Sequence, residues 1–262
     1  MSDPLPISVL LLARDETRAL ERLLPALSFA REVVVVWDPR GDAAARAVAE
    51  RGGARVLGRE FDGFGTQRQF ALAHCTQPWV LWIDADERPD AELVEALRAW
   101  FTNGNGAADR DRAAGWRLER RNWFLGRRIR FCGWSDEKLV RGARRDRARF
   151  DDAPVHERLI VDGPIVDLAG ALEHHSYQTL DQCVEKMTRY ARAGAERAWR
   201  EGRRAGLLDL LLRPPLRFAR QYLLQLGVLD GAHGLVLCAF AAAQVFLKYA
   251  ALWDRARTGA GE

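Results

Sequence analysis

Short apolar runs alternate with stretches of helical spacing along the first third of the chain. The clearest run lies at residues 32–37, where four consecutive valines stand between Glu32 and Trp37, and such runs are typical of buried strands. Comparable strands are expected at residues 7–12, 54–57 and 80–83, and helices at residues 17–28, 42–51 and 67–74. Because strands that alternate with helices of about ten residues form parallel sheets with right-handed crossovers, the pattern predicts an α/β fold with a mostly parallel sheet.

The pattern changes after a further helix expected at residues 89–101. Residues 102–115 are rich in Gly, Asn, Asp and Ala, which favours a loop. Shorter strands and one amphipathic helix follow, at residues 116–118, 138–140, 158–161 and 179–199. The 262 residues suffice for one large domain with an extension, so we expect a domain over residues 1–200 and a helical extension over residues 201–262.

The formal net charge of +4 arises mainly from two arginine-rich segments, residues 127–130 and 141–149. Such clusters suit an anionic partner, either nucleic acid or a phosphate-bearing membrane surface. A solvated face without a partner is the alternative.

The four cysteines are widely scattered, and no pair has the spacing of a metal or redox site. We therefore expect free thiols in a reducing compartment. The apolar run at residues 7–13 lacks a preceding basic region and a following small-residue cleavage site, so it is interpreted as a first strand and not as a signal peptide. These features predict a cytosolic protein.

Two carboxylates, Asp84 and Asp86, directly follow the apolar run at residues 80–83. The carboxyl ends of strands in an open α/β sheet form the edge at which ligands bind. Hard oxygen ligands at that edge suit Mg²⁺ or Mn²⁺, which can also hold a diphosphate. A solvated turn with acidic residues is the other interpretation.

The C-terminal segment combines apolar runs with basic residues. The longest run, residues 235–247, is shorter than the roughly 20 residues needed to span a bilayer. Basic residues are interspersed through this segment, at Arg213, Arg217, Arg220, Lys248 and Arg255. This pattern predicts helices that lie in a membrane interface, with a helical hairpin packed on the main domain or on a second subunit as the alternative.

Several motifs occur in an order that is typical of one family. They are Ser8–Leu12 with Asp15-Glu16, Gly63–Leu72, Asp84–Glu87, Arg121–Gly126, Cys132–Trp134, Pro154–Arg158, His174–Tyr177, Lys186–Tyr190 and Phe246–Tyr249. On these motifs the chain resembles glycosyltransferase family 2, and within it the bacterial lipopolysaccharide core β-1,4-glucosyltransferases.

The resemblance implies a GT-A fold, Rossmann-like, with a donor half at about residues 1–102 and an acceptor half at about residues 115–200. It implies an inverting, metal-dependent transfer of a hexose, expected to be glucose, from a UDP-sugar to a lipopolysaccharide inner-core saccharide. The enzyme would work on a lipid-linked acceptor at the cytosolic face of the inner membrane, without a nucleic-acid partner, and as a homodimer if the C-terminal helices seal one. Two alternatives stay open: the same chemistry on a polyprenyl phosphate or a capsule or exopolysaccharide precursor, and a non-catalytic nucleotide-sugar-binding protein. A phosphatase of the haloacid dehalogenase type is disfavoured, because its Asp-x-Asp pair follows the N-terminal strand.

The resemblance also implies roles for particular residues. Asp86 would be the metal ligand, Asp84 would lie nearer the ribose or the metal's waters, and His175 would be a third ligand unless it is a core or capping histidine. Arg68 would donate to the diphosphate unless it is a surface arginine. The expected nucleotide-sugar-binding residues are Ala13, Asp15, Glu16, Asp38, Arg68 and Asp84.

The general base is expected at Glu137, with Asp136 as the second candidate, because family members carry an acidic residue close to this position. His156 and Glu157 would orient the acceptor or its loop. The chain departs from the family in two places. Aspartate comes at Asp38 instead of at Trp37, and Asp15 stands where asparagine is usual, which bears on the choice of nucleobase or sugar.

Overall fold

The computed structural model describes residues 3–102, 112–134, 136–151 and 158–258. The chain forms two compact units. The first comprises Met1–Arg120 and Glu137–His174, and the second comprises Arg121–Asp136 and His175–Glu262. The second unit includes residues 175–200, which the sequence assigned to the main domain. The expected His156 and Glu157 lie outside the described residues.

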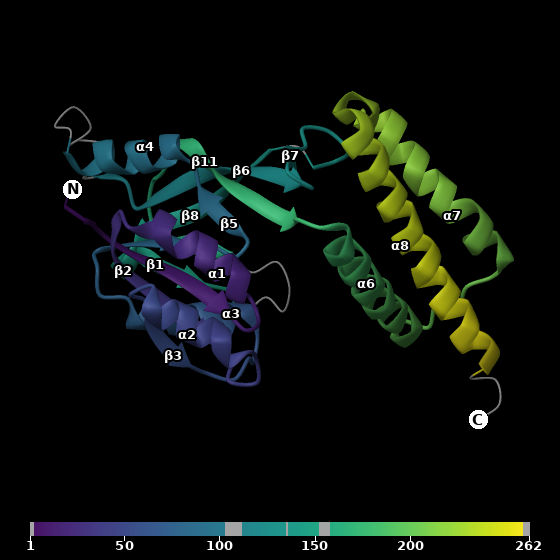
Figure 1. The fold of residues 1–262 in the computed structure, drawn as a ribbon, viewed down its shortest axis with the longest axis horizontal. Helices are drawn as coiled ribbons and strands as arrows, with labels where there is room; N and C mark the ends of the chain where they lie inside the picture. The colour runs from purple at the N-terminus through teal and green to yellow at the C-terminus, as the bar shows by residue number, and fades with distance from the viewer. Residues whose placement is uncertain (1–2, 103–111, 135, 152–157, 259–262) are drawn as a thin grey trace. The chain divides into compact units, whose positions relative to one another are not determined.

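The first unit begins with the alternation that the sequence predicted. Four parallel strands lie in the order β3-β2-β1-β4, and the helices α1, α2 and α3 connect them (Figure 1). The register pairs Ala13 with Trp37, so the carboxyl ends of β1 and β2 reach the same edge of the sheet. The bounds are β1 Leu5–Ala13, α1 Thr17–Leu23, β2 Ala30–Trp37, α2 Ala43–Arg51, β3 Arg55–Gly58, α3 Phe64–His74 and β4 Trp79–Trp82.

The second half of the sheet is not parallel. Strand β5, which precedes α4 (Ala91–Thr102), and strands β6, β8 and β11, which follow it, complete the order β3-β2-β1-β4-β8-β6-β11-β5. β8 runs antiparallel to both β4 and β6. The expected mostly parallel sheet is therefore a mixed sheet, although the α/β class is confirmed. The physical reason is that no helix is described between β6 and β8, and a parallel pair needs a long crossover. The bounds are β5 Glu87–Pro89, β6 Gly115–Phe124, β8 Glu137–Arg144 and β11 Ile165–Tyr177, with a separate hairpin of β9 Ala148–Phe150 and β10 Leu159–Val161.

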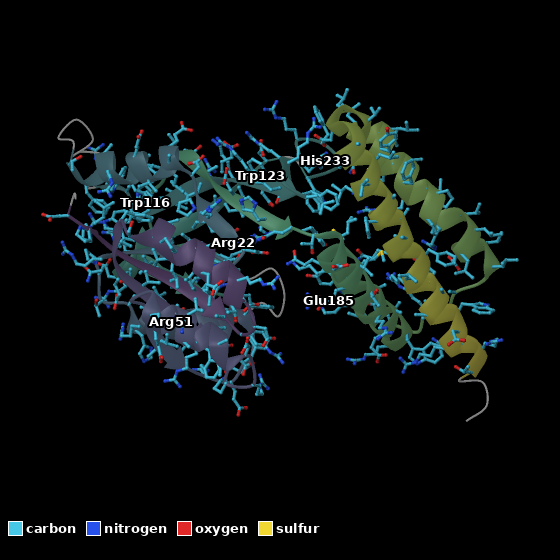
Figure 2. The ribbon with its side chains drawn as sticks, viewed as in Figure 1. Arg22, Arg51, Trp116, Trp123, Glu185 and His233 are labelled. Atoms are coloured by element: carbon cyan, nitrogen blue, oxygen red, sulfur yellow. The ribbon has the colours of Figure 1, made fainter. Side chains whose placement is uncertain are left out.

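A tryptophan stack fixes the middle of this sheet. The rings of Trp79 on β4 and Trp116 on β6 lie parallel, with their centroids 4.2 Å apart. Trp116, which Figure 2 labels, is fully buried. Gly142 of β8 lies against this stack, because a Cβ built there would be 2.3 Å from Cε3 of Trp116. A side chain at position 142 is thus excluded by the packing of β8.

The second unit is mainly helical. The helices α6 and α7 both pack against α8, and the short strand β7 (Arg127–Arg128) pairs with the end of β6 (Figure 1). Buried Cys132, Cys183 and Cys238 contribute to its core. The bounds are α6 Leu180–Arg200, α7 Leu207–Ala219, the turns Arg220–Leu224 and Gly227–Asp230, and α8 Gly231–Thr258.

The last helix is longer than its apolar run. α8 begins at Gly231, continues through Gly234 and has 28 residues. Within the part of the chain that the structure describes, residues 227–258 form one helical segment that is long and apolar enough, by length and composition alone, to cross a membrane. Its apolar 18-residue window has a mean hydropathy of 1.9. The helix is thus longer than the apolar run at residues 235–247, because it does not stop at the glycines, and its length alone does not exclude a span.

Candidate active site

A turn after β4 gathers the acidic residues predicted from the sequence. Asp84 accepts hydrogen bonds from Trp82 Nε1 at 2.9 Å and from Arg68 Nη2 at 2.8 Å, while Arg141 Nη2 lies 3.2 Å from its second oxygen. The backbone N–H of Asp84 donates to the Glu87 carboxylate at 3.0 Å. The turn is therefore held by side chains from α3, β4 and β8.

Two buried cations enclose the Trp82 indole. The guanidinium carbons of Arg141 and Arg68 lie 3.8 and 4.2 Å from its ring centroid, a distance at which cation–π attraction is expected. Burial would raise the pKa of Asp84, but Arg141 and Arg68 outweigh it and hold that pKa below its ordinary value. Asp84 is thus kept ionised.

Glu87 is the counterpart of Arg141 on the inner side of the turn. Its carboxylate accepts from Arg141 Nη2 at 2.6 Å, and both side chains are almost fully buried. Burial raises the pKa of Glu87 above its ordinary value, and Arg141 offsets only part of that rise. Removing either partner would leave a buried group without its counter-charge.

Arg141 reaches these carboxylates because β8 contains a β-bulge. Trp116 pairs with Gly142 and Arg117 pairs with Val140, so Arg141 is the extra residue on β8. A bulge interrupts the alternation of side chains and re-aims the inserted one. Sequence reasoning placed Arg141 only in the arginine-rich segment 141–149, which was expected to suit an anionic partner, whereas the structure buries its side chain against Asp84 and Glu87.

Asp86 contacts a histidine that was not predicted as a ligand. His174 Nε2 lies 3.4 Å from the Asp86 carboxylate, and His174 pairs with Glu87 across β11 and β5. The expected His175 belongs to the second unit, where its ring stacks on Trp123 with centroids 5.4 Å apart. Among the described residues, no group of three or more His, Cys, Asp and Glu side chains is arranged to hold a metal ion.

Glu137, the expected base, lines a pocket beside this turn. The pocket has a volume of about 560 Å³, and Glu137 pairs there with Arg120. Its walls include Trp82, Asp84, Arg120, Lys138, Arg141 and Arg158. Asp136, the second candidate, pairs with Arg128 in the other unit.

Four of the six predicted nucleotide-sugar-binding residues, Ala13, Asp15, Glu16 and Asp38, lie at or just after the carboxyl ends of β1 and β2. Ala13 is the last residue of β1, and Glu16 accepts backbone hydrogen bonds from Arg14 and Asp15 at 2.6 and 3.0 Å. Asp15 accepts from the backbone N–H of Asp42 at 2.8 Å.

Asp38, which follows β2, is buried and forms two hydrogen bonds to the Arg40 guanidinium, at 2.8 and 2.9 Å. This pairing lowers the pKa of Asp38 to about 2. The Trp37 indole, which stands at the position where the family usually has aspartate, donates to the Arg14 carbonyl at 3.3 Å.

An α/β sheet with acidic residues at its carboxyl edge is the arrangement expected of an enzyme that binds a nucleotide ligand. The comparison with known families identifies the enzyme class. The sequence model of Glycosyl transferase family 2 matches residues 13–156, more than half of the chain. The chain belongs to this family and is a glycosyltransferase, and its fold is α/β with a mixed sheet.

The chain is similar to two curated proteins over nearly its whole length. It is 28% identical over 261 residues to the lipopolysaccharide core biosynthesis glycosyltransferase LpsC of Rhizobium meliloti (strain 1021), covering 97% of this chain and 94% of that protein. It is 23% identical over 257 residues to the uncharacterized glycosyltransferase RP128 of Rickettsia prowazekii (strain Madrid E), covering 95% and 87%.

Two solved structures show more distant likenesses. Staphylococcus aureus TarS 1-349 aligns with a TM-score of 0.42 and 16% identity, covering 97% of this chain and 91% of that chain. Glucosyl-3-phosphoglycerate synthase from Mycobacterium tuberculosis, crystallised with Mg²⁺ and UDP, aligns with a TM-score of 0.35 and 18% identity, covering 53% and 56%. Both are too distant to add to the assignment.

Proposed function

We propose that this glycosyltransferase moves a hexose, glucose by expectation, from a UDP-sugar to an inner-core saccharide of lipopolysaccharide with inversion at the transferred carbon. The observation that carries the chemistry is the turn at Asp84–Glu87, which shares one pocket wall with Glu137. The acceptor class is suggested by LpsC, a lipopolysaccharide core biosynthesis glycosyltransferase that covers nearly the same length.

The donor set of the turn suits Mg²⁺ or Mn²⁺. Both oxygens of Asp84 are engaged by Arg68, Trp82 and Arg141, whereas Asp86 is half-exposed beside His174. Asp86 would therefore hold the cation directly, and Asp84 would act through bound water or the ribose. When bound, the cation neutralises the charge that develops on the leaving diphosphate.

Glu137 would deprotonate the acceptor hydroxyl. It lines the pocket and its partner Arg120 keeps the carboxylate oriented. The acceptor sugar would occupy the pocket at the β8 side, whereas the nucleotide would lie over the ends of β1 and β2, near Glu16 and Asp38. Asp136 is retained as the second candidate for the base.

The enzyme would be peripheral on the cytosolic face of the inner membrane, where a lipid-linked acceptor is displayed. A surface-bound enzyme searches for such an acceptor in two dimensions. The exposed apolar residues of α7, together with nearby arginines, support this location.

The decisive test is Asp86→Ala, assayed for UDP-glucose turnover with Mg²⁺ or Mn²⁺. Loss of a direct metal ligand should lower turnover by orders of magnitude while circular dichroism shows a folded protein. The matched control is Asp146→Ala, an exposed aspartate on a surface turn, which should keep full turnover. Full activity of Asp86→Ala, or undiminished activity in a chelator, would show that the proposed metal role is wrong.

A further inference from the structure

One side of α7 carries five exposed leucines, here called the leucine face: Leu207, Leu208, Leu211, Leu212 and Leu216. Their spacing of one, three, one and four residues places them on one half of the helix. Leu207 and Leu208 are 68% and 70% exposed, so most of the surface of each residue is open to solvent. Figure 2 shows side chains of α7 projecting away from α8.

The apolar surface continues beyond α7 into the turns before α8. This helical tip, residues 223–229, exposes Leu223, Leu224, Leu226, Val228 and Leu229. Leu224 is 80% exposed, and Leu226 adopts a positive φ of 55°, which is uncommon for a residue other than glycine. A costly backbone conformation that presents leucine to the outside points to a surface that is covered in use.

Four arginines near this surface have no ion-pair partner among the residues that the structure describes. Arg217 and Arg220 follow the leucine face along the chain, and neither forms a salt bridge there. Arg127 and Arg130 lie at the far side of the helical tip: Arg127 approaches Gly231, and the backbone N–H of Arg130 donates to Asp230 at 3.2 Å. Unpaired cations beside exposed leucines complement an anionic lipid surface, to which each basic residue contributes on the order of 1 kcal/mol.

The packing of α6 against α8 makes it unfavourable for α8 to cross a bilayer. The charged helix α6 packs along α8, where Glu196 pairs with Arg255 and a Cβ at Gly194 would lie 3.3 Å from Lys248 Cδ. If α8 crossed a bilayer, the charged residues of α6 would enter the hydrocarbon with it, which is costly. Length and composition therefore do not decide the orientation of α8.

We propose that the leucine face and the helical tip bind the surface of an anionic lipid bilayer, with α7 in the plane of the interface and no helix crossing it. This inference deepens the proposed function by naming its membrane-binding surface and rests on it for the peripheral location. Leucines enter the boundary between headgroups and acyl chains, and Arg217, Arg220, Arg127 and Arg130 contact lipid phosphates.

The test is flotation of the purified full chain with vesicles of phosphatidylcholine, with or without phosphatidylglycerol. Wild type should bind the anionic vesicles, and Leu208→Gln/Leu212→Gln should weaken that binding about tenfold or more because less apolar surface is buried. The matched control is Leu180→Gln/Val184→Gln on α6, two residues of similar exposure that lie outside the surface. An equal loss in both pairs, or no loss in the first, would overturn the assignment of the surface.

The electrostatic part is tested by Arg217→Gln/Arg220→Gln against Arg192→Gln on α6. The first variant should lose about tenfold or more in affinity for anionic vesicles, and the control should not. Equal binding of wild type to neutral and anionic vesicles would overturn the role of the arginines. Retention in the membrane fraction after alkaline carbonate extraction would overturn the interfacial orientation in favour of a span.

A second copy of the chain is the competing occupant of the leucine face. A wild-type dimer that Leu208→Gln/Leu212→Gln dissociates, without vesicle binding, would replace the membrane by a homodimer. UDP-glucose turnover, measured without vesicles, tests the proposed chemistry separately from the membrane-binding surface. Turnover without vesicle binding refutes only this inference, and vesicle binding without turnover refutes only the proposed chemistry.

Discussion

Arg141 connects groups from three elements at a single guanidinium. Its Nη2 lies within hydrogen-bonding distance of both Asp84 and Glu87, and its plane covers Trp82. An arginine serves here better than a lysine, because a planar fork can hold two carboxylates and still stack on an aromatic ring. The conformation of the turn at Asp84–Glu87 thus depends on a residue of a neighbouring strand.

Arg141→Met should destabilise the fold strongly. The substitution leaves Glu87 buried without its cation, and breaking a buried pair costs roughly 3–5 kcal/mol. Urea unfolding followed by tryptophan fluorescence measures the loss. In Arg141→Met/Glu87→Gln the unpaired charge is gone, so much of the stability should return. A double variant as unstable as the sum of both single variants would contradict the pairing.

Glu137→Gln should lower transfer by about 10²–10⁴-fold, the usual contribution of a general base. The amide keeps the size of the side chain but cannot take the proton of the acceptor hydroxyl. Donor binding, measured by calorimetry, should hardly change. Asp136→Asn is the comparison. If that variant loses transfer and Glu137→Gln does not, the base lies one residue earlier.

At the residue scale the sequence was informative only where acidic side chains directly follow the end of a predicted strand. Asp84 and Asp86 were predicted as ligands because an apolar strand ends directly before them. Arg141 was not found, because a bulge breaks the alternation from which its direction would be inferred. His174 and His175 are neighbours on one strand, and the sequence does not tell which of them contacts Asp86.

At the scale of elements, β1, β2 and β4 were predictable because each contains a compact apolar run that is buried on both faces. β8 was predicted as a shorter strand, at residues 138–140, because its buried half contains an arginine and a glycine, Arg141 and Gly142, which do not form an apolar run. Its antiparallel direction follows from tertiary connections that no local pattern records. The full length of α8 was missed for a similar reason, since tertiary packing holds Gly231 and Gly234 in place.

Gly142→Ala should destabilise β8. The added Cβ would meet Trp116 within the Trp79 stack, and forcing a methyl group into a packed core typically costs about 1–3 kcal/mol. Equilibrium unfolding in urea measures the difference. Gly58→Ala on β3 is the control, because the nearest atom to its Cβ would be 3.8 Å away. Equal stabilities of the two variants would contradict the packing described for β8.

At the scale of the whole molecule, the reactivity of the four cysteines measures how well the cores of both units are packed. Cys75 lies in the first unit, the other three lie in the second, and all four are free and buried. Burial raises the pKa of Cys75 to about 12 and raises those of Cys132, Cys183 and Cys238 as well.

The native protein should therefore react slowly with iodoacetamide. The thiolate is the reactive form, and at pH 8 a thiol with a raised pKa is almost wholly protonated. All four cysteines should be modified once guanidinium unfolds the chain, as mass spectrometry of the labelled protein would show. Rapid modification of any cysteine in the folded protein would contradict the burial of that residue.

The packing of the second unit also bears on how the C-terminal helices should be probed. α8 covers the alanine-lined side of α6, where Ala195 and Ala198 form a cluster with Leu252. Removal of everything after Gly206 would expose that cluster and create a new apolar surface. Substitutions on the exposed side of α7 therefore separate membrane binding from folding more cleanly than truncation does.

Because of the bulge in β8, the number of residues in that strand determines which side chains face the pocket. Glu137 stands at the start of the strand, Gly142 fits under Trp116, and Arg141 is the extra residue between the regular pairs. Deleting one residue between Glu137 and Gly142 would remove the bulge and restore the regular alternation of side chains. The residues on one side of the deletion would then point to the opposite face of the sheet. Length variation that is harmless in a surface loop would here change which residues enter the pocket. Homologous chains that share the chemistry should therefore keep the number of residues between Glu137 and Gly142, even where the residues themselves differ.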